Sequence, residues 1–269
     1  MSSKPAPLSL PLGYRYFWYD EIDSTNLEAF RKNNEEGLVD DQLAGSWICA
    51  KRQSGGRGTK GNQWVSESGN LYTSLLTRTP CLSKDLAQIS ILAVLAAITA
   101  IEQFAPKNYN IGDLCLKWPN DILLKGKKMC GILVESRPSK KTGNFDIVIG
   151  LGINLAVHPD VESLFPAGNL KQGGWTCSRD DLFVVLARSM RDWFTIWRDG
   201  EGFETLRLAW LERSCHIGHQ VVVRVGETDF EGRFTTISRE GALVLVDASG
   251  FEKNISSGHI RSIARPRSE

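Results

Sequence analysis

A glycine-rich loop offers the clearest chemistry in this sequence. Residues 50–64, AKRQSGGRGTKGNQW, place four glycines and four basic residues between two strand-like segments. The glycines are Gly55, Gly56, Gly58 and Gly61. Without Cβ atoms they let backbone N–H groups approach an anion, while Arg57 supplies a planar fork for an oxyanion. Trp64 offers a face on which a flat ring could stack. A flexible surface loop is the alternative for any glycine-rich stretch.

Three other stretches carry polar residues in places suited to binding. KWPND occupies 117–121 and is followed by KMCGIL at 128–133. Ser24, Thr25 and Asn26 precede a predicted helix, and an anionic group is favoured at a helix N-terminus. Thr25 with Glu28 is typical of a capping box, so capping alone explains one or two of these residues.

Composition excludes several classes of protein. The 269-residue chain has 32 Lys and Arg against 31 Asp and Glu, so it lacks the overall positive charge of a duplex-binding protein. Its most apolar segment, 86–101, is shorter than the roughly 20 residues of a membrane span, and we expect a buried helix there. Six scattered cysteines without a CxxC pair predict neither a disulfide framework nor a zinc site. A reducing cytoplasm fits best.

Hydrophobic periodicity predicts an α+β fold with two domains. We interpret residues 1–13 as a loose leader, 14–215 as a large domain and 216–269 as a small β-barrel with short strands. The helices of the large domain are expected near 25–36, 84–104, 178–199 and 203–213. The strands between them must position the polar stretches.

Two further motif matches carry little weight. His216-Ile217-Gly218-His219 spells a signature of class I aminoacyl-tRNA synthetases, but it follows a predicted helix and enters a predicted strand, the wrong context for cradling phosphates. Without further ligands nearby, the two histidines are also a weak metal site. Gly150-x-Gly152 lacks the third glycine of a dinucleotide fingerprint, so we predict a tight backbone turn.

Taken in order, these motifs resemble those of the biotin protein ligases, or biotin–[acetyl-CoA-carboxylase] ligases. The resemblance covers roughly residues 14–264 and rests on the order of the glycine loop, KWPND and KxxGIL. It implies a catalytic domain with a mixed β-sheet, related to class II aminoacyl-tRNA synthetases, and a C-terminal SH3-like barrel. It also implies two reactions. Biotin and MgATP form biotinoyl-5′-AMP and pyrophosphate, and a lysine of a biotin carboxyl carrier protein then accepts the biotin.

The resemblance implies roles for individual residues. Lys117 and Arg57 become the catalytic residues, because two anions, the biotin carboxylate and the α-phosphate, must meet against their repulsion. Residues implied to contact biotin are Ser24, Thr25, Asn26, Gln53, Arg57, Gly58, Thr59, Lys117 and Gly131. Residues implied to contact ATP or the adenylate are Gly56, Gly58, Gly61, Trp64, Lys128, Gly152 and Asn154. For Asp121, placing Mg²⁺ and capping the Pro-Asn-Asp turn are equally open.

The chain departs from the family pattern in its glycine loop. The family commonly has arginines where this chain has Thr59 and Asn62, so we expect weaker retention of the adenylate unless Lys60 or Arg52 compensates. Arg261 lies where family members often have an arginine near ATP, although the residues around it match poorly.

The resemblance implies biotin, ATP and a carrier protein or domain as partners, with no membrane association, and it leaves a homodimer open. About 13 residues precede the first predicted strand, too few for the helix-turn-helix domain of some family members, so no specific DNA binding is expected. Two alternatives remain. One is a lipoate or octanoate ligase of the same fold, and the other is a non-catalytic biotin-sensing module, against which Lys117 and Arg57 argue.

Overall fold

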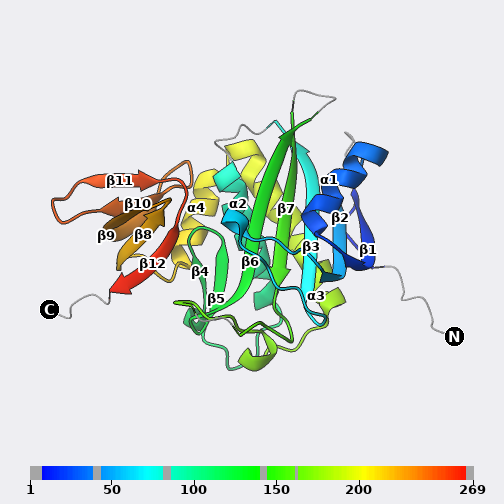
Figure 1. Cartoon of the computed structure of the whole chain (residues 1–269), viewed down its shortest axis with the longest axis horizontal. Coiled ribbons are helices and arrows are strands. Elements are labelled where there is room, and N and C mark those ends of the chain that lie inside the picture. The colour runs from blue at the N-terminus through cyan, green and yellow to red at the C-terminus, as the bar shows by residue number, and fades with distance from the viewer. Residues whose placement is uncertain (1–7, 39–43, 81–85, 140–143, 161–162, 265–269) are drawn as a thin grey trace.

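The large sheet is mixed, as expected. The computed structural model describes residues 8–38, 44–80, 86–139, 144–160 and 163–264, so the first seven residues of the predicted leader lie outside it. Seven strands are ordered β1-β2-β3-β7-β6-β5-β4 (Figure 1). Their bounds are β1 Tyr14–Ile22, β2 Gly45–Gln53, β3 Leu71–Thr79, β4 Leu114–Lys117, β5 Asp121–Leu124, β6 Lys127–Pro138 and β7 Phe145–Ile153. The β1–β2 pair is parallel and the other pairs are antiparallel.

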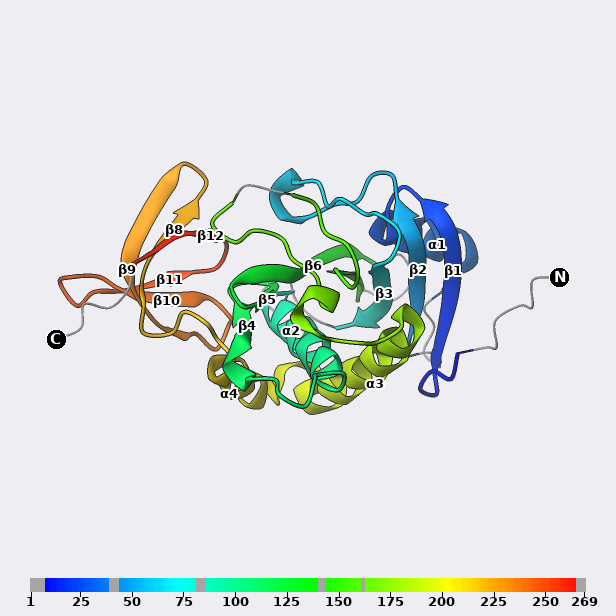
Figure 2. The ribbon, with the colours of Figure 1, turned by 90° about the horizontal axis from the view of Figure 1, so that it is seen from below.

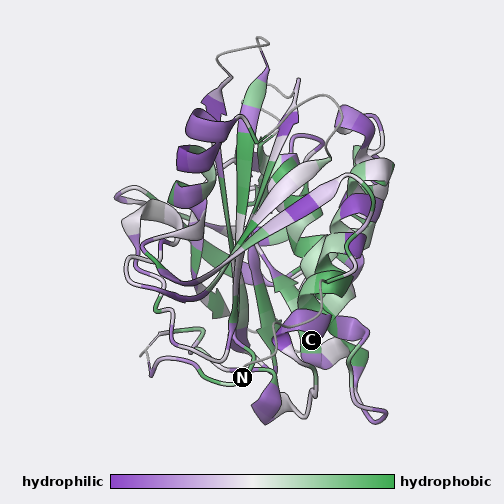
Figure 3. Cartoon of the chain, turned by 90° about the vertical axis from the view of Figure 1, so that its right-hand side faces the viewer, coloured by the Kyte–Doolittle hydropathy of each residue, from purple (hydrophilic) through white to green (hydrophobic). Residues whose placement is uncertain are grey.

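Helices cover both faces of this sheet. Helix α1 (Thr25–Glu36) packs on one face, and α2 (Leu86–Glu102), α3 (Arg179–Trp197) and α4 (Phe203–Glu212) lie on the other (Figure 2). Strand β2 alternates between the two cores, since Trp47 and Cys49 join the core of α2 and α3 while Ile48 joins that of α1. Hydrophobic residues concentrate along the central strands (Figure 3).

Helix α2 is the buried helix that the apolar segment predicts. Ile89, Leu92 and Leu95 are completely buried, and each such side chain contributes roughly 1.5–3 kcal/mol by leaving water. None of the described helices combines the length and apolar character needed to cross a membrane.

The capping box expected at the start of α1 is wrong. The N-cap is Ser24, whose side chain makes no capping hydrogen bond, and the hydroxyl of Thr25 donates to Oε1 of Gln53 (3.1 Å). The helix ends at Gly37 with φ 64°, as predicted, because a residue without Cβ takes this left-handed conformation without strain. The polar residues at this helix start therefore serve the interior between α1 and the sheet.

A second, antiparallel sheet follows α4. Its strands are β8 Gln220–Val225, β9 Thr228–Ile237, β10 Leu243–Val246, β11 Glu252–Ile255 and β12 His259–Ala264, in the order β11-β10-β9-β8-β12. Strand β12 has no counterpart among the strands predicted from the sequence. Among the described residues β11 and β12 are not neighbours, so these strands form an open sheet, where the sequence had predicted a barrel. The α+β class is confirmed.

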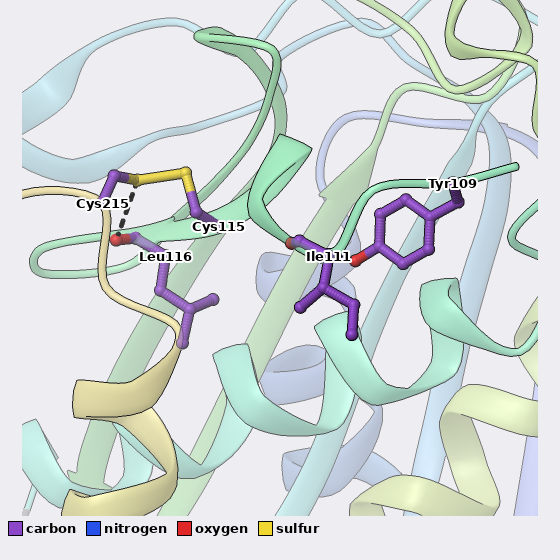
Figure 4. Close-up of a disulfide and its surroundings, with 5 residues drawn as sticks. All are labelled: Tyr109, Ile111, Cys115, Leu116 and Cys215. Atoms are coloured by element: carbon purple, nitrogen blue, oxygen red, sulfur yellow. Dashed lines mark hydrogen bonds between the residues drawn. A yellow bond between two sulfur atoms is a disulfide. The ribbon is translucent and has the colours of Figure 1, made fainter.

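One disulfide corrects the expectation drawn from the scattered cysteines. Cys115 of β4 and Cys215, 100 residues later, are joined, with Cα atoms 5.4 Å apart (Figure 4). Strand β4 is the edge of the large sheet, and the chain returns along it after α4. The Leu116 N–H donates to Arg213 O (2.7 Å), and the Cys215 N–H donates to Leu116 O (3.0 Å). Sequence spacing could not show this proximity, because it depends on where α4 ends.

Candidate active site

The site lies where the loop after β2 crosses the sheet face that carries α1. Two pockets open there, and Trp64, Asp121 and Lys128 line both of them. The narrower pocket collects most of the residues expected to contact biotin: Ser24, Thr25, Asn26, Gln53, Arg57, Gly58, Thr59 and Gly131, together with Gly152. The wider pocket, about 520 Å³, contains Lys117, Asn154 and Arg261. Gly56 and Gly61 line neither pocket.

The glycines of β7 are required by close packing. Gly150 and Gly152 lie inside the strand, paired on both sides with β3 and β6, so the predicted tight turn is wrong. A Cβ on Gly150 would lie 2.2 Å from Oδ1 of Asn26, and one on Gly152 would lie 2.5 Å from the Trp64 indole. Because the backbone is held by both neighbouring strands, only glycine leaves room for these side chains.

Asn26 is fixed at the base of the narrow pocket. Its Nδ2 donates to Oε2 of Glu135 (2.8 Å), and its Oδ1 accepts from the hydroxyl of Ser74 (2.6 Å). The side chain is 3% exposed. Since buried polar groups with satisfied partners hold a single orientation, this amide is a rigid wall of the pocket.

Gln53 connects the end of β2 to α1. Its Oε1 accepts from the backbone N–H of Thr25 (2.8 Å), and its Nε2 donates to Ser66 Oγ (2.9 Å). These bonds occupy the amide and fix the start of the glycine loop relative to α1. Gln53 therefore shapes the pocket through the groups it holds.

Arg57 is held at the pocket by Glu135, a residue that the sequence analysis missed. Its Nη2 lies 2.6 Å from Glu135 Oε2, the same oxygen that accepts from Asn26. The only sequence signal was that Glu135 directly follows the KxxGILV run. One carboxylate thus orients both a cation and an amide that face the narrow pocket.

Lys117, Asp121 and Lys128 form a compact charged cluster between the two pockets. Nζ of Lys117 lies 3.0 Å from Oδ2 of Asp121, and Nζ of Lys128 lies 2.6 Å from Oδ1. Burial alone would raise the pKa of the Asp121 carboxyl, but the two ammonium groups hold that pKa below its usual value. With two cations and one carboxylate, the cluster keeps a positive charge that an anionic ligand could neutralise.

The cluster does not fit a metal ion held by the protein. Mg²⁺ prefers carboxylate oxygens, yet both oxygens of Asp121 already accept from lysines. The described residues also contain no group of three or more His, Cys, Asp or Glu side chains that could hold a metal ion. In this structure Asp121 orients the two lysines.

Aromatic rings cover both cations. Nζ of Lys128 lies 5.4 Å from the centre of the Trp64 ring, and Nζ of Lys117 lies 4.8 Å from that of Phe165. Such contacts favour a cation most where water is excluded. Phe165, absent from the sequence-based site, reaches Lys117 because the Lys128 N–H donates to Pro166 O (2.8 Å).

Asn154, Arg261 and Thr59 lie near the pockets, and the first two already contact other groups of the protein. Asn154 donates from Nδ2 to Gly168 O (3.0 Å), so its amide already supports the wall of the wider pocket. Arg261 lines that pocket from β12 and lies 3.1 Å from Asp229. Thr59 begins the short 3₁₀ turn η1 (Thr59–Gly61), and its effect on adenylate retention stays a prediction.

Comparison with known proteins agrees with this arrangement. The model of the biotin/lipoate A/B protein ligase family matches residues 20–154, and that of the biotin protein ligase C terminal domain matches 216–260. A biotin–[acetyl-CoA-carboxylase] ligase of Paracoccus denitrificans is 33% identical over 85% of this chain and 92% of its own length. The chain belongs to the biotin/lipoate A/B protein ligase family.

Other members of the biotin/lipoate A/B protein ligase family extend the similarity. The bifunctional ligase/repressor BirA of Escherichia coli K12 is 30% identical over 89% of this chain and 71% of its own length. The structure of a biotin protein ligase from Aquifex aeolicus in complex with biotin and ATP gives a TM-score of 0.73 at 25% identity. That match covers 93% of this chain and 98% of the Aquifex chain, so it includes both sheets.

Proposed function

We propose that this chain is a biotin protein ligase. It activates biotin with ATP to biotinoyl-5′-AMP and transfers the biotin to a lysine of a carrier protein. The narrow pocket binds biotin, and the wider pocket binds ATP. The observation that carries the proposal is the lysine cluster at the junction of the two pockets, where the two anionic reactants would meet: Lys128 and Asp121 line both pockets and Lys117 lines the wider one.

The first step asks little acid–base chemistry of the protein. A carboxylate oxygen of biotin attacks the α-phosphorus of ATP, a P–O bond forms, and pyrophosphate leaves with the electrons of the broken P–O bond. Lys117 and Lys128 offset the repulsion between the two anions, and Arg57 binds oxygens from the narrow pocket. Electrostatic stabilisation of this kind is worth most in a site prepared before the reaction.

The second step releases AMP. The amine of the carrier lysine attacks the carbonyl carbon of the mixed anhydride, an amide bond forms, and the bond from that carbon to the AMP oxygen breaks. The amine proton passes to water or to the leaving phosphate. In this proposal the acceptor is a biotin carboxyl carrier protein or domain and the reaction takes place in the cytoplasm. The absence of specific DNA binding and the state of oligomerisation stay predictions of the sequence.

Pyrophosphate exchange into ATP tests the proposal, with biotin, lipoate or octanoate as the acyl donor. We expect exchange with biotin alone. Lys117→Ala should lower the exchange rate by about 100-fold or more, as removal of a transition-state donor does elsewhere. Lys107→Ala is the matched control, because Lys107 is an exposed lysine that lines neither pocket.

Each alternative predicts a different result. Exchange with lipoate or octanoate, but not with biotin, would identify the chain as a lipoate or octanoate ligase of the same fold. Biotin binding by calorimetry without exchange for any donor would identify a biotin-sensing module. Either result would overturn the proposal that the chain is a biotin protein ligase.

A further inference from the structure

The disulfide lies beside the lysine cluster. Cys115 and Lys117 are two residues apart on β4, so their side chains project from the same face of the strand. Cys215 lies on the segment that runs along β4 at the sheet edge, and its sulfur is 3.2 Å from the Leu116 carbonyl oxygen (Figure 4). The bond therefore fixes the segment 213–216 next to the strand that carries Lys117.

Contacts continue from this segment to the ammonium group. His216, the residue after Cys215, is 6% exposed, and its ring centre lies 5.6 Å from that of Phe165. The Phe165 ring covers Nζ of Lys117 at 4.8 Å. His216 Nδ1 is buried and makes no hydrogen bond within the described part of the chain. Its ring packing against Phe165 thus links the disulfide segment to the Lys117 side chain, in addition to the backbone bonds that the segment makes with Leu116.

The same segment joins the two sheets. Its start is hydrogen-bonded to β4, as described above. Directly after it, the Gly218 N–H donates to Phe234 O (2.7 Å) and the Phe234 N–H donates to His219 O (2.9 Å), which ties the chain to β9 of the second sheet. A change in this segment is therefore passed to both sheets and to the wall of the wider pocket.

We propose that Cys115 and Cys215 form a thiol–disulfide site that sets how firmly His216 and Phe165 hold Lys117. This inference rests on the proposed ligase function. The Cys115–Cys215 disulfide keeps the Lys117 side chain in its active position, and reduction of the disulfide lets that side chain move. Disulfides in cytosolic proteins are usually transient or redox-sensing, and both cysteines are only half-buried, so a small thiol can reach them.

The exchange balances with a low-molecular-weight disulfide such as oxidised glutathione. The thiolate of one cysteine attacks it, and a mixed disulfide forms while one glutathione thiolate leaves. The second cysteine then attacks the mixed disulfide, which closes the protein disulfide and releases the second glutathione. The two cysteine protons end on the two released thiols, and the glutathione disulfide is the species reduced.

Two of the other cysteines are poor competitors. Cys49 and Cys130 are fully buried, and burial raises the pKa of both thiols, which keeps them protonated. Cys177 is half-buried and serves as a control position. Cys81 lies outside the described residues, so disulfide mapping must cover it.

The test compares the full-length protein equilibrated in oxidised and in reduced glutathione. Disulfide occupancy is mapped by mass spectrometry, and the exchange rate and the KM for ATP are measured with biotin. We expect the oxidised form to exchange about three- to tenfold faster, because a small misplacement of a catalytic group costs rate. Cys115→Ser/Cys215→Ser should match the reduced form in both buffers, and Cys177→Ser should respond as the wild type does.

Variants of His216 separate positioning from stability. In the oxidised form, His216→Ala should lower kcat with little change in the KM for biotin. His216→Phe should restore most of the rate, because it keeps a ring against Phe165. Two results would overturn the redox inference and leave the ligase proposal standing. One is an equal exchange rate in both buffers when mass spectrometry shows the expected disulfide occupancy, and the other is the absence of a Cys115–Cys215 bond in oxidised glutathione. No exchange in either buffer would overturn the ligase proposal.

Discussion

At the scale of single residues, the site depends on two glycines of β7, Gly150 and Gly152, that have no side chain. Asn26 and Trp64 reach the sheet only because Gly150 and Gly152 have no side chain. From the family resemblance the sequence identified Asn26, Trp64 and Gly152 as candidates, but not Gly150. It misread the two glycines as a turn, because a lone GxG does not show which strands lie on either side of it.

Gly150→Ala tests this packing. The added methyl group would displace the amide of Asn26, which is held by Ser74 and Glu135, into the space where biotin would bind. We expect the affinity for biotin to fall at least about tenfold, which corresponds to about 1.4 kcal/mol. Titration calorimetry with biotin would measure it.

The control for that variant is Gly112→Ala. Gly112 belongs to the turn η3 (Ile111–Asp113), and the nearest atom to an added Cβ is 3.8 Å away. It should bind biotin as the wild type does. Unchanged affinity in Gly150→Ala would show that Asn26 can move without cost.

At the scale of elements, the segment after α4 matters most, because it carries His216 from the sheet edge to the second sheet. As predicted from the sequence, the motif that begins at His216 follows a helix, α4, and leads into a strand, β8. What the sequence could not show is that this histidine lies buried beside Phe165. That contact depends on the meeting of two segments about 50 residues apart.

The buried histidine predicts a pH dependence of stability. Burial, with smaller effects of Lys117 and His219, lowers the pKa of His216 from 6.5 to about 4. Between these values the unfolded chain binds more protons at this position than the folded chain. The contribution of His216 to the free energy of unfolding is therefore complete above about pH 6.5. As the pH is lowered toward 4, the free energy of unfolding falls by up to about 1.4 kcal/mol per pH unit through this residue.

Urea unfolding at about pH 5 and about pH 7.5 checks this sign. His216→Phe should lose less stability on acidification than the wild type. His158→Gln, a change at a half-buried histidine outside this segment, is the control. An equal loss in His216→Phe and the wild type would show that His216 is protonated in the folded state too.

At the scale of the whole molecule, the order of strands brings distant parts of the chain together. The sequence predicted most strands and helices and the α+β class, because hydrophobic period and turn residues are local signals. It could not predict that β4 ends the large sheet, and so it missed the disulfide; β12, which pairs with β8 in the second sheet, was also missed. Glu135 was missed for the same reason, since its role depends on the crossing of the glycine loop over β6.

The disulfide should stabilise the folded chain as a whole. It joins residues 100 positions apart, and closing a loop of that size lowers the entropy of the unfolded chain, which is worth roughly 2–5 kcal/mol. Reduction should therefore lower Tm by about 5–15 °C in a protein of this size. Scanning calorimetry with and without reductant measures this.

The matched variant for that measurement is Cys115→Ser/Cys215→Ser. Its Tm should be close to that of the reduced wild type and should not respond to reductant. A Tm of the wild type that is the same with and without reductant would contradict the prediction.

Trp64 has one more consequence, because its indole is a wall of both pockets. In the proposed ligase, a ligand that shifts this ring in one pocket changes the shape offered to the ligand of the other. The two binding free energies are then coupled, and thermodynamics requires the coupling to be reciprocal. Whatever factor biotin applies to the affinity for ATP, ATP must apply to the affinity for biotin.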